Sequence, residues 1–103
     1  MDVTDLISKL TSGRYEFSQH AFVRAIERNI SGQEVTEAGR CVEIVESYPD
    51  DKYSPSCLLL GFTKSGRPLH MQVCYTEEDM LKIITIYEPD VFLWLDYRMR
   101  RMP

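Results

Sequence analysis

The sequence predicts a single α+β domain spanning residues 1–103, with N-terminal helices packed on one face of an antiparallel sheet of about four strands. Helical spacing of apolar residues and helix caps dominate residues 3–40, whereas apolar or alternating runs bounded by turn residues dominate residues 41–87. A chain of 103 residues is the size of one domain that buries a core without disulfides. Helices followed by neighbouring strands build two layers, so the helices are expected to cover one face of the sheet.

Three helices are expected before the first long strand. Apolar residues recur at helical spacing over residues 3–12. Ser18 stands where a side chain would cap a second helix over residues 18–28. The sequence S-G-Q-E at 31–34 has the form of a capping box, which predicts a third helix that ends near residue 40.

Four strands are expected after the helices, with turn residues between them. Residues 14–17 are expected to form only an extended link between the first two helices. Pro49 and Pro89 end the first and last strands, because proline is excluded from the interior of a sheet. The segment from Val91 to Arg101 is expected to form a packed turn or a short helix. The predicted strands are 41–48, 57–63, 67–75 and 81–87.

The charge of the chain limits the partners that it can bind. The formal net charge is −4, which argues against a broad nonspecific nucleic-acid surface, because such binding depends on many Lys and Arg contacts to phosphates. Acidic residues concentrate at 34–51 and 77–79, whereas arginines gather near the C-terminus and on the second helix. A small basic site inside an acidic envelope fits this pattern, and so does an acidic flank that meets a basic partner.

The sequence predicts neither a metal site nor a cofactor site. Its three cysteines are widely spaced and expected to be reduced, and its two histidines have no third ligand at a recognisable zinc spacing. Phosphate-binding loops, nucleophile elbows and metalloprotease motifs are missing. A metal-independent ribonuclease fits what is left, because it needs only a base, an acid and cations on the phosphate.

No membrane association is expected, and the predicted location is the cytoplasm. No apolar run approaches the roughly 18 residues that a membrane span requires. Asp2 and Asp5 stand where a signal peptide would carry basic residues.

One face of the second helix carries the strongest candidate for chemistry. His20, Arg24 and Arg28 recur at intervals of one turn and therefore share a side of the helix. An imidazole beside two guanidinium groups suits a phosphodiester substrate, because the first can move a proton and the others can hold a phosphate. We expect Phe22, Ala25, Ile26 and Asn29 to fall on the other side, with the apolar residues among them facing the core. A solvated helix face without function is the competing interpretation.

Other candidates lie on the strands and near the C-terminus. His70 alternates with Leu69 and Met71, so it is expected on the open face of the sheet, away from the helices. Tyr87 could donate a proton near a phosphate, although tyrosine is also common in strands. Residues that could contact RNA, or equally anchor the fold, are Arg67, Trp94, Tyr97 and Arg98.

The order of six sequence blocks adds a resemblance to a known family. The blocks are S-Q-H-A-x-x-R-x-x-E-R at 18–28, I-S-x-x-E-V at 30–35, I-V-E-x-Y-P-D-D at 44–51, L-L-L-G-F at 58–62, G-R-P-L-H at 66–70 and I-I-T-I-Y-E-P-D at 83–90. Together they resemble the small bacterial domain-of-unknown-function family 4258, related by fold to the BrnT and RelE toxins of toxin–antitoxin systems.

The resemblance implies a barnase/RelE-like fold and the toxin component of a type II toxin–antitoxin system. Such a toxin would act as an endoribonuclease or as a translation inhibitor on an RNA substrate. It would pair with a cognate antitoxin, for example a YgiT-type zinc-finger or helix-turn-helix protein. The family's motifs fall on His20, Arg24, Arg28, Arg67, His70, Tyr87 and Glu88.

Two hypotheses follow from these residues and this resemblance. In the first, His20 is the general base or acid, Arg24 and Arg28 bind the scissile phosphate, and His70 or Tyr87 is the complementary proton donor. In the second, the chain is a non-catalytic protein-interaction module of the same fold, which docks a partner through its acidic stretch or an open sheet edge. The acidic net charge departs from the lysine-rich surface of ribosome-bound toxins and argues against dependence on the ribosome.

Overall fold

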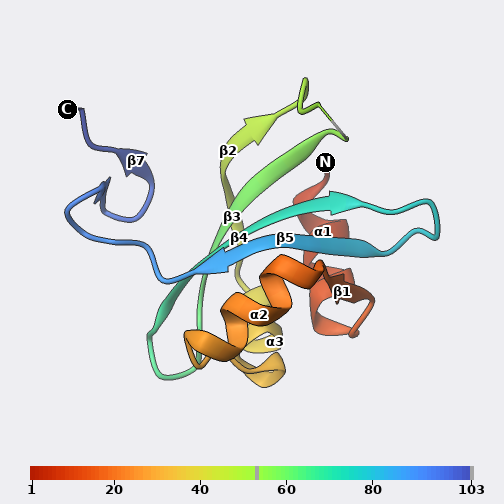
Figure 1. The fold of residues 1–103 in the computed structure, drawn as a ribbon, viewed down its shortest axis with the longest axis horizontal. Coiled ribbons are helices and arrows are strands. Elements are labelled where there is room, and N and C mark those ends of the chain that lie inside the picture. Colours follow the sequence, from red (N-terminus) through yellow and green to blue (C-terminus); the bar gives the residue numbers. More distant parts are fainter. Residues whose placement is uncertain (53, 103) are drawn as a thin grey trace.

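The computed structural model describes residues 1–52 and 54–102, which form three helices and seven strands (Figure 1). The long predicted elements are confirmed, with boundaries that differ by a residue or two. In chain order the elements are α1 (Val3–Thr11), β1 (Tyr15–Phe17), α2 (Gln19–Glu27), α3 (Gly32–Gly39), β2 (Glu43–Tyr48), β3 (Ser56–Phe62), β4 (Pro68–Tyr75), β5 (Leu81–Tyr87), β6 (Trp94–Leu95) and β7 (Met99–Arg100).

The main sheet has five strands in the order β1-β5-β4-β3-β2, not the four that were expected. β2 to β5 form the predicted antiparallel meander. The additional strand is β1, which was expected to be only a link. It pairs in parallel with β5, with Tyr15 opposite Leu81 and Phe17 opposite Ile83, so the sheet is mixed rather than antiparallel.

The helices begin where their capping residues predict. The Ser18 hydroxyl accepts a hydrogen bond from the Ala21 amide at the start of α2. Ser31 and Glu34 form both halves of a capping box at the start of α3, and that helix ends at Gly39. These local signals position the C-terminal end of α2 beside the start of α3.

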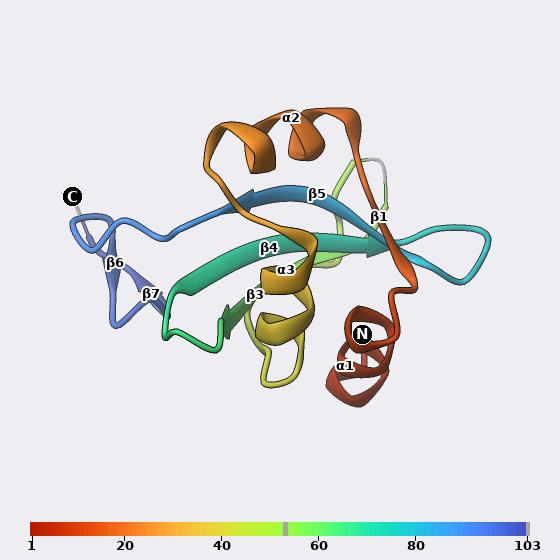
Figure 2. The ribbon, with the colours of Figure 1, turned by 90° about the horizontal axis from the view of Figure 1, so that it is seen from below.

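All three helices pack on one face of the sheet, as predicted (Figure 2). The core joins apolar residues of α1, α2 and α3 to those of β3, β4 and β5 that point toward the helices. The backbones of α3 and β3 approach so closely that a Cβ at Gly61 would overlap the Ala38 carbonyl group and lie 2.9 Å from its carbon. Only glycine fits at this position.

The packing of α2 agrees with the expectation for Ala25 and differs from it for Phe22 and Ile26. Ala21 and Ala25 are buried against the sheet, whereas Phe22 is 55% and Ile26 is 65% exposed. The small alanines allow the helix axis to lie close to β5, and this orientation turns the larger apolar residues outward. Phe22 keeps an edge contact with the ring of Phe17, with 6.4 Å between the ring centroids.

The segment after β5 forms a small hairpin rather than a helix. β6 and β7 pair with each other and lie at the opposite end of the sheet from α1 (Figures 1 and 2). The turn between them places Asp96 and Tyr97 at φ values of 53° and 60°, a left-handed conformation that is unfavourable for a tyrosine. The two short strands leave no room for a helix here.

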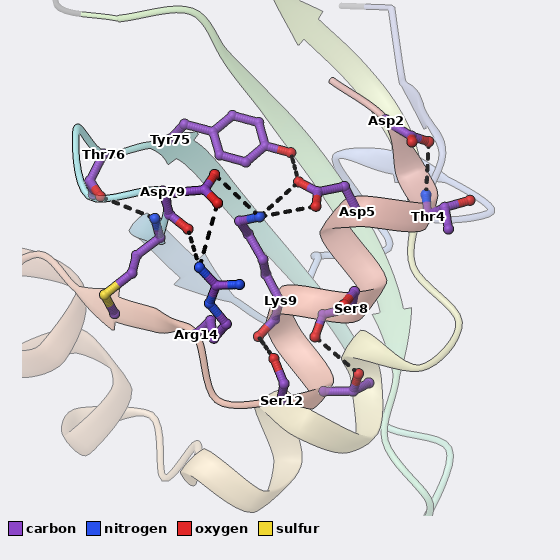
Figure 3. Close-up of polar contacts among 12 residues, drawn as sticks. Asp2, Thr4, Asp5, Ser8, Lys9, Ser12, Arg14, Tyr75, Thr76 and Asp79 are labelled. Carbon is purple, nitrogen blue, oxygen red and sulfur yellow. Dashed lines mark hydrogen bonds and ion pairs between the residues drawn. The ribbon is translucent and has the colours of Figure 1, made fainter.

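A network of charges ties α1 to the turn between β4 and β5 (Figure 3). The Lys9 side chain is buried between Asp5, at 3.0 Å, and Asp79, at 3.4 Å. The Tyr75 hydroxyl donates to Asp5, and Arg14 pairs with Asp79 at 3.4 Å. The hydrogen bond from Tyr75, followed by that from Lys9, holds the pKa of Asp5 below its usual value of 3.8.

We expect Asp5→Asn to be less stable than the wild type at neutral pH. Because the pKa of Asp5 is lower in the folded state, its carboxylate stabilises the fold above about pH 4, and this stabilisation is lost as the pH falls through the folded value. Urea unfolding should therefore show a gap between the two proteins at pH 7 that narrows as the pH falls below about 4. Asp50→Asn, in the exposed turn after β2, should show little gap at either pH.

Candidate functional site

A pocket of about 550 Å³ lies where β5 ends and the C-terminal hairpin begins. It brings together residues from α2, the β3–β4 turn, β5 and the C-terminal segment. Its lining is rich in arginine and includes an apolar wall. The lining residues are Arg28, Arg67, Tyr87, Glu88, Asp90, Leu93, Trp94 and Arg100.

Arg28 supplies the most available cation in this pocket. It caps the C-terminal end of α2, and its Nη1 donates to the Ile86 carbonyl at 2.7 Å. Within residues 1–52 and 54–102 it forms no ion pair with a carboxylate, so its other guanidinium donors are free for a ligand. A guanidinium with free N–H groups binds phosphate or carboxylate oxygens in a bidentate manner.

Arg67, by contrast, is occupied within the protein. Its Nη1 lies 3.1 Å from Glu34, and its Nε lies 3.4 Å from Glu88. It also donates to the carbonyls of Asn29 and Arg28 at 2.9 and 2.8 Å. Arg67 therefore fixes the junction of α2 and α3, and thereby the backbone of Arg28.

Behind the pocket, Tyr87, His70 and Tyr97 form a chain of hydrogen bonds. Tyr87 and His70 are directly opposite each other on β5 and β4. The His70 Nε2 lies 2.7 Å from the Tyr97 carbonyl oxygen, and its Nδ1 lies 3.1 Å from the Tyr87 hydroxyl. A carbonyl can only accept, so Nε2 carries the proton, and Nδ1 of the neutral ring accepts the Tyr87 proton.

The position of His70 departs from the prediction of an open-face residue. It does lie on the face opposite the helices, but it is completely buried, because the C-terminal hairpin covers that part of the face. The Trp94 ring stands perpendicular to the imidazole, with 4.5 Å between the centroids. Burial lowers the pKa of His70 and raises that of Tyr87, so both are uncharged at neutral pH.

The burial of His70 makes the free energy of unfolding depend on pH near neutrality. The pKa of His70 is below its usual value of 6.5 in the folded state, so the unfolded chain takes up the proton first and stability falls as the pH drops through 6.5. We expect His70→Asn to remove this fall. His20→Asn, which changes the exposed histidine, should retain it. Urea unfolding between about pH 8 and pH 5 measures both slopes.

The other predicted RNA contacts are held by neighbouring side chains. Arg98 forms a two-point ion pair with Glu43, at 2.7 and 3.2 Å, and Arg100 pairs with Glu46 in the same way. The Arg100 guanidinium also covers the Trp94 ring at 4.6 Å from its centroid. The Tyr97 ring packs against Phe62. Of this predicted group, only Arg67 and Trp94 line the pocket.

His20 and Arg24 lie outside the pocket. His20 is exposed in the first turn of α2, about 12 Å along the helix axis from Arg28, given a rise of 1.5 Å per residue. Arg24 pairs with Glu27 at 2.7 Å. The structure therefore brings Arg28, Tyr87 and His70 together and leaves the first two members of the predicted helix motif apart from them.

Three lining residues were not predicted at all, and Glu88 was indicated only by the family's strand motif. Asp90 and Leu93 follow Tyr87 along the chain, and Arg100 belongs to the group of C-terminal arginines. The concentration of arginine near the C-terminus was the signal for Arg100. Nothing in the local sequence indicates that the hairpin folds back over β4.

The described residues contain no group of three or more His, Cys, Asp or Glu side chains arranged to hold a metal ion. Within the same part of the chain, no helix has the length and apolar character needed to cross a membrane.

The comparisons with known proteins give one match. The sequence profile of a domain of unknown function (DUF4258) matches residues 17–88, a range that includes α2, α3 and the sheet through β5. No curated protein and no solved structure matches the chain.

Proposed function

The chain belongs to the DUF4258 family, and we propose that this member is a toxin that cleaves RNA at the pocket beside Tyr87. The observation that supports the proposal most strongly is the position of Arg28. Its guanidinium is free of carboxylates within the described residues and lines the same pocket as a tyrosine hydroxyl backed by a neutral histidine. Cleavage of a phosphodiester by its own 2′-hydroxyl needs a cation and a proton acceptor of this kind.

The pair of Tyr87 and His70 supplies the proton acceptor. The 2′-hydroxyl proton passes to the Tyr87 oxygen while the Tyr87 proton passes to Nδ1 of His70. The resulting imidazolium keeps both hydrogen bonds, because it donates to Tyr87 and to the Tyr97 carbonyl. The 2′-oxygen then attacks the phosphorus, Arg28 holds the phosphate oxygens, and the departing 5′-oxygen takes a proton from water. The hydroxide left behind takes the Tyr87 proton while Nδ1 of His70 returns its proton to Tyr87, so the pair is neutral again. The products are a 2′,3′-cyclic phosphate and a free 5′-hydroxyl.

Purified protein tests this proposal on a short single-stranded RNA. The wild type is expected to produce fragments that end in a cyclic phosphate, and Tyr87→Phe is expected to produce none, because phenylalanine cannot relay the proton. Circular dichroism should show the same fold for both proteins. Equal cleavage by the two proteins, or none by the wild type, would refute the proposal.

A second candidate function is that of a protein-interaction module, and the outer face of α2 favours it. Phe22, Val23 and Ile26 are 55%, 45% and 65% exposed and form one apolar ridge along the helix. Contiguous exposed apolar surface is typical of a protein interface. The proposed occupant is a cognate antitoxin that covers the ridge with an apolar surface of its own, because the nearby Arg24 is already paired with Glu27.

Coexpression with the protein encoded beside this chain tests the second function. Phe22→Ser with Ile26→Ser should abolish copurification while leaving RNA cleavage unchanged. A matched change on the same helix, Gln19→Ser, should preserve copurification. Retention of the partner by the double variant would exclude the ridge as its docking site.

A further inference from the structure

The C-terminal segment, residues 90–102, is weakly joined to the rest of the molecule. The family match ends at residue 88, just before the segment begins. Among the described residues, its backbone hydrogen bonds lie within the segment itself, for example from the Trp94 amide to the Asp90 carbonyl. The exception is the Tyr97 carbonyl, which accepts from His70.

Side chains make the remaining attachments. Trp94 is the one buried residue of the described segment, and it packs on His70. The Tyr97 ring packs against Phe62. Two ion pairs, Arg98 with Glu43 and Arg100 with Glu46, join the segment to β2. These arginines are partly exposed, so salt screens both pairs.

Most apolar side chains of the segment point away from the sheet and contribute little to its attachment. Phe92 is 84% exposed, Leu95 is 48% exposed and Met99 is 63% exposed. The left-handed conformation of Tyr97 adds a cost that is released if the segment leaves. The sheet beneath has its own core on the other face, which does not include this segment.

We propose that residues 90–102 form a cap that opens as a unit while the rest of the fold stays intact, and that opening exposes His70. When closed, the cap occupies Nε2 of the imidazole and covers it with Trp94. When open, it leaves His70 at the surface beside Tyr87, and the pocket loses the lining residues that the cap supplies, which are Asp90, Leu93, Trp94 and Arg100. The opening of the cap does not depend on the proposed function. The effect of opening on RNA cleavage rests on the proposed function.

The two histidines of the chain provide a direct test with an internal reference. Diethyl pyrocarbonate modifies accessible imidazoles, and mass spectrometry of peptides resolves His20 from His70. In the wild type we expect His20 to react at once and His70 at least ~10-fold more slowly, because His20 is exposed and His70 is buried. High salt should speed the reaction of His70 alone.

Removing the ion pairs from the β2 side should open the cap further. We expect Glu43→Gln with Glu46→Gln to increase the rate at His70 by about 10-fold, while the core amides of Met71 and Ile83 keep wild-type hydrogen exchange. Arg24→Gln with Glu27→Gln, which removes a comparable pair on α2, should leave the rate at His70 unchanged. An unchanged rate at His70 in the β2 variant would overturn the proposal. The proposal would also be overturned if hydrogen exchange of the core amides accelerated by the same factor as the reaction of His70, because opening would then be global unfolding.

RNA cleavage by the same variants separates the cap from the proposed function. Faster modification with slower cleavage supports both, because the closed cap supplies half of the pocket lining and the Tyr97 carbonyl that the relay uses. Faster modification with unchanged cleavage by an active enzyme overturns the role of the cap in completing the site. Faster modification in a protein that never cleaves RNA supports the cap and refutes the proposed function.

Discussion

Arg28→Ala is expected to reduce RNA cleavage by about 100-fold, the typical cost of removing one preorganised group that stabilises charge in a transition state. Its guanidinium lines the pocket and forms no carboxylate ion pair among the described residues, whereas the other two arginines of the pocket, Arg67 and Arg100, are paired with glutamates. Arg28→Lys should recover part of the rate, because it restores the charge but not the bidentate geometry. Single-turnover cleavage of a labelled RNA measures the three rates.

The matched controls for this prediction lie on the same helix. His20→Ala and Arg24→Ala should cleave at the wild-type rate, because His20 is about two turns away along α2 and Arg24 is paired with Glu27. Loss of cleavage in His20→Ala would instead support the role of His20 as general acid or base, which the helix motif predicts. That result would require a substrate that spans α2 rather than one confined to the pocket.

Gly61→Ala is expected to destabilise the fold by about 3 kcal/mol, the upper part of the range for overpacking a tight core. A Cβ at this position would overlap the backbone carbonyl group of Ala38, and a backbone atom cannot move without shifting the whole of α3. The helix would have to leave β3, and its contacts with α1 would be lost as well. Urea unfolding followed by circular dichroism measures the loss.

Gly32→Ala is the appropriate comparison for Gly61→Ala. Gly32 begins α3, and a Cβ there would meet only the Tyr15 hydroxyl, at 3.8 Å. This change should be neutral or stabilise the fold by up to about 1 kcal/mol, because alanine lowers the entropy of the unfolded chain. An equal loss in both variants would show that the effect comes from the glycine backbone and not from the close approach of α3.

Local signals predicted most of the fold because they act within a few residues. Ser18 and the capping box at Ser31 act within one turn of a helix, so their effect can be read directly from the sequence. The strands of the meander were also predictable, because turn residues separate consecutive apolar runs. The short β1 was not, because its pairing depends on Leu81 to Ile83, far along the chain.

The pattern on α2 misled the prediction for a different reason. Phe22 and Ile26 are the largest apolar residues of the helix, and a pattern weighted by hydrophobicity places them inside. Close packing against β5 instead selects the smallest side chains, Ala21 and Ala25. Size, rather than hydrophobicity, decides which face of this helix is buried.

The sequence indicated several residues of the candidate site, but it did not indicate how they are arranged. Arg28, His70 and Tyr87 were each identified by chemistry, but only the register of β4 against β5 brings the last two together. The burial of His70 depends on Trp94 folding back from beyond the end of β5. No periodicity in the sequence carries that long-range contact.

The parallel pairing of β1 with β5 sets the order in which the chain can fold during synthesis. Residues 15–17 are synthesised more than 60 residues before their partners at 81–83. The helices have the same difficulty, because they pack on strands that come later in the chain. Contacts between such distant residues slow folding, since the intervening chain must be ordered first. The three helices are therefore made before the strands that they pack on, and they reach their final positions only after those strands have formed.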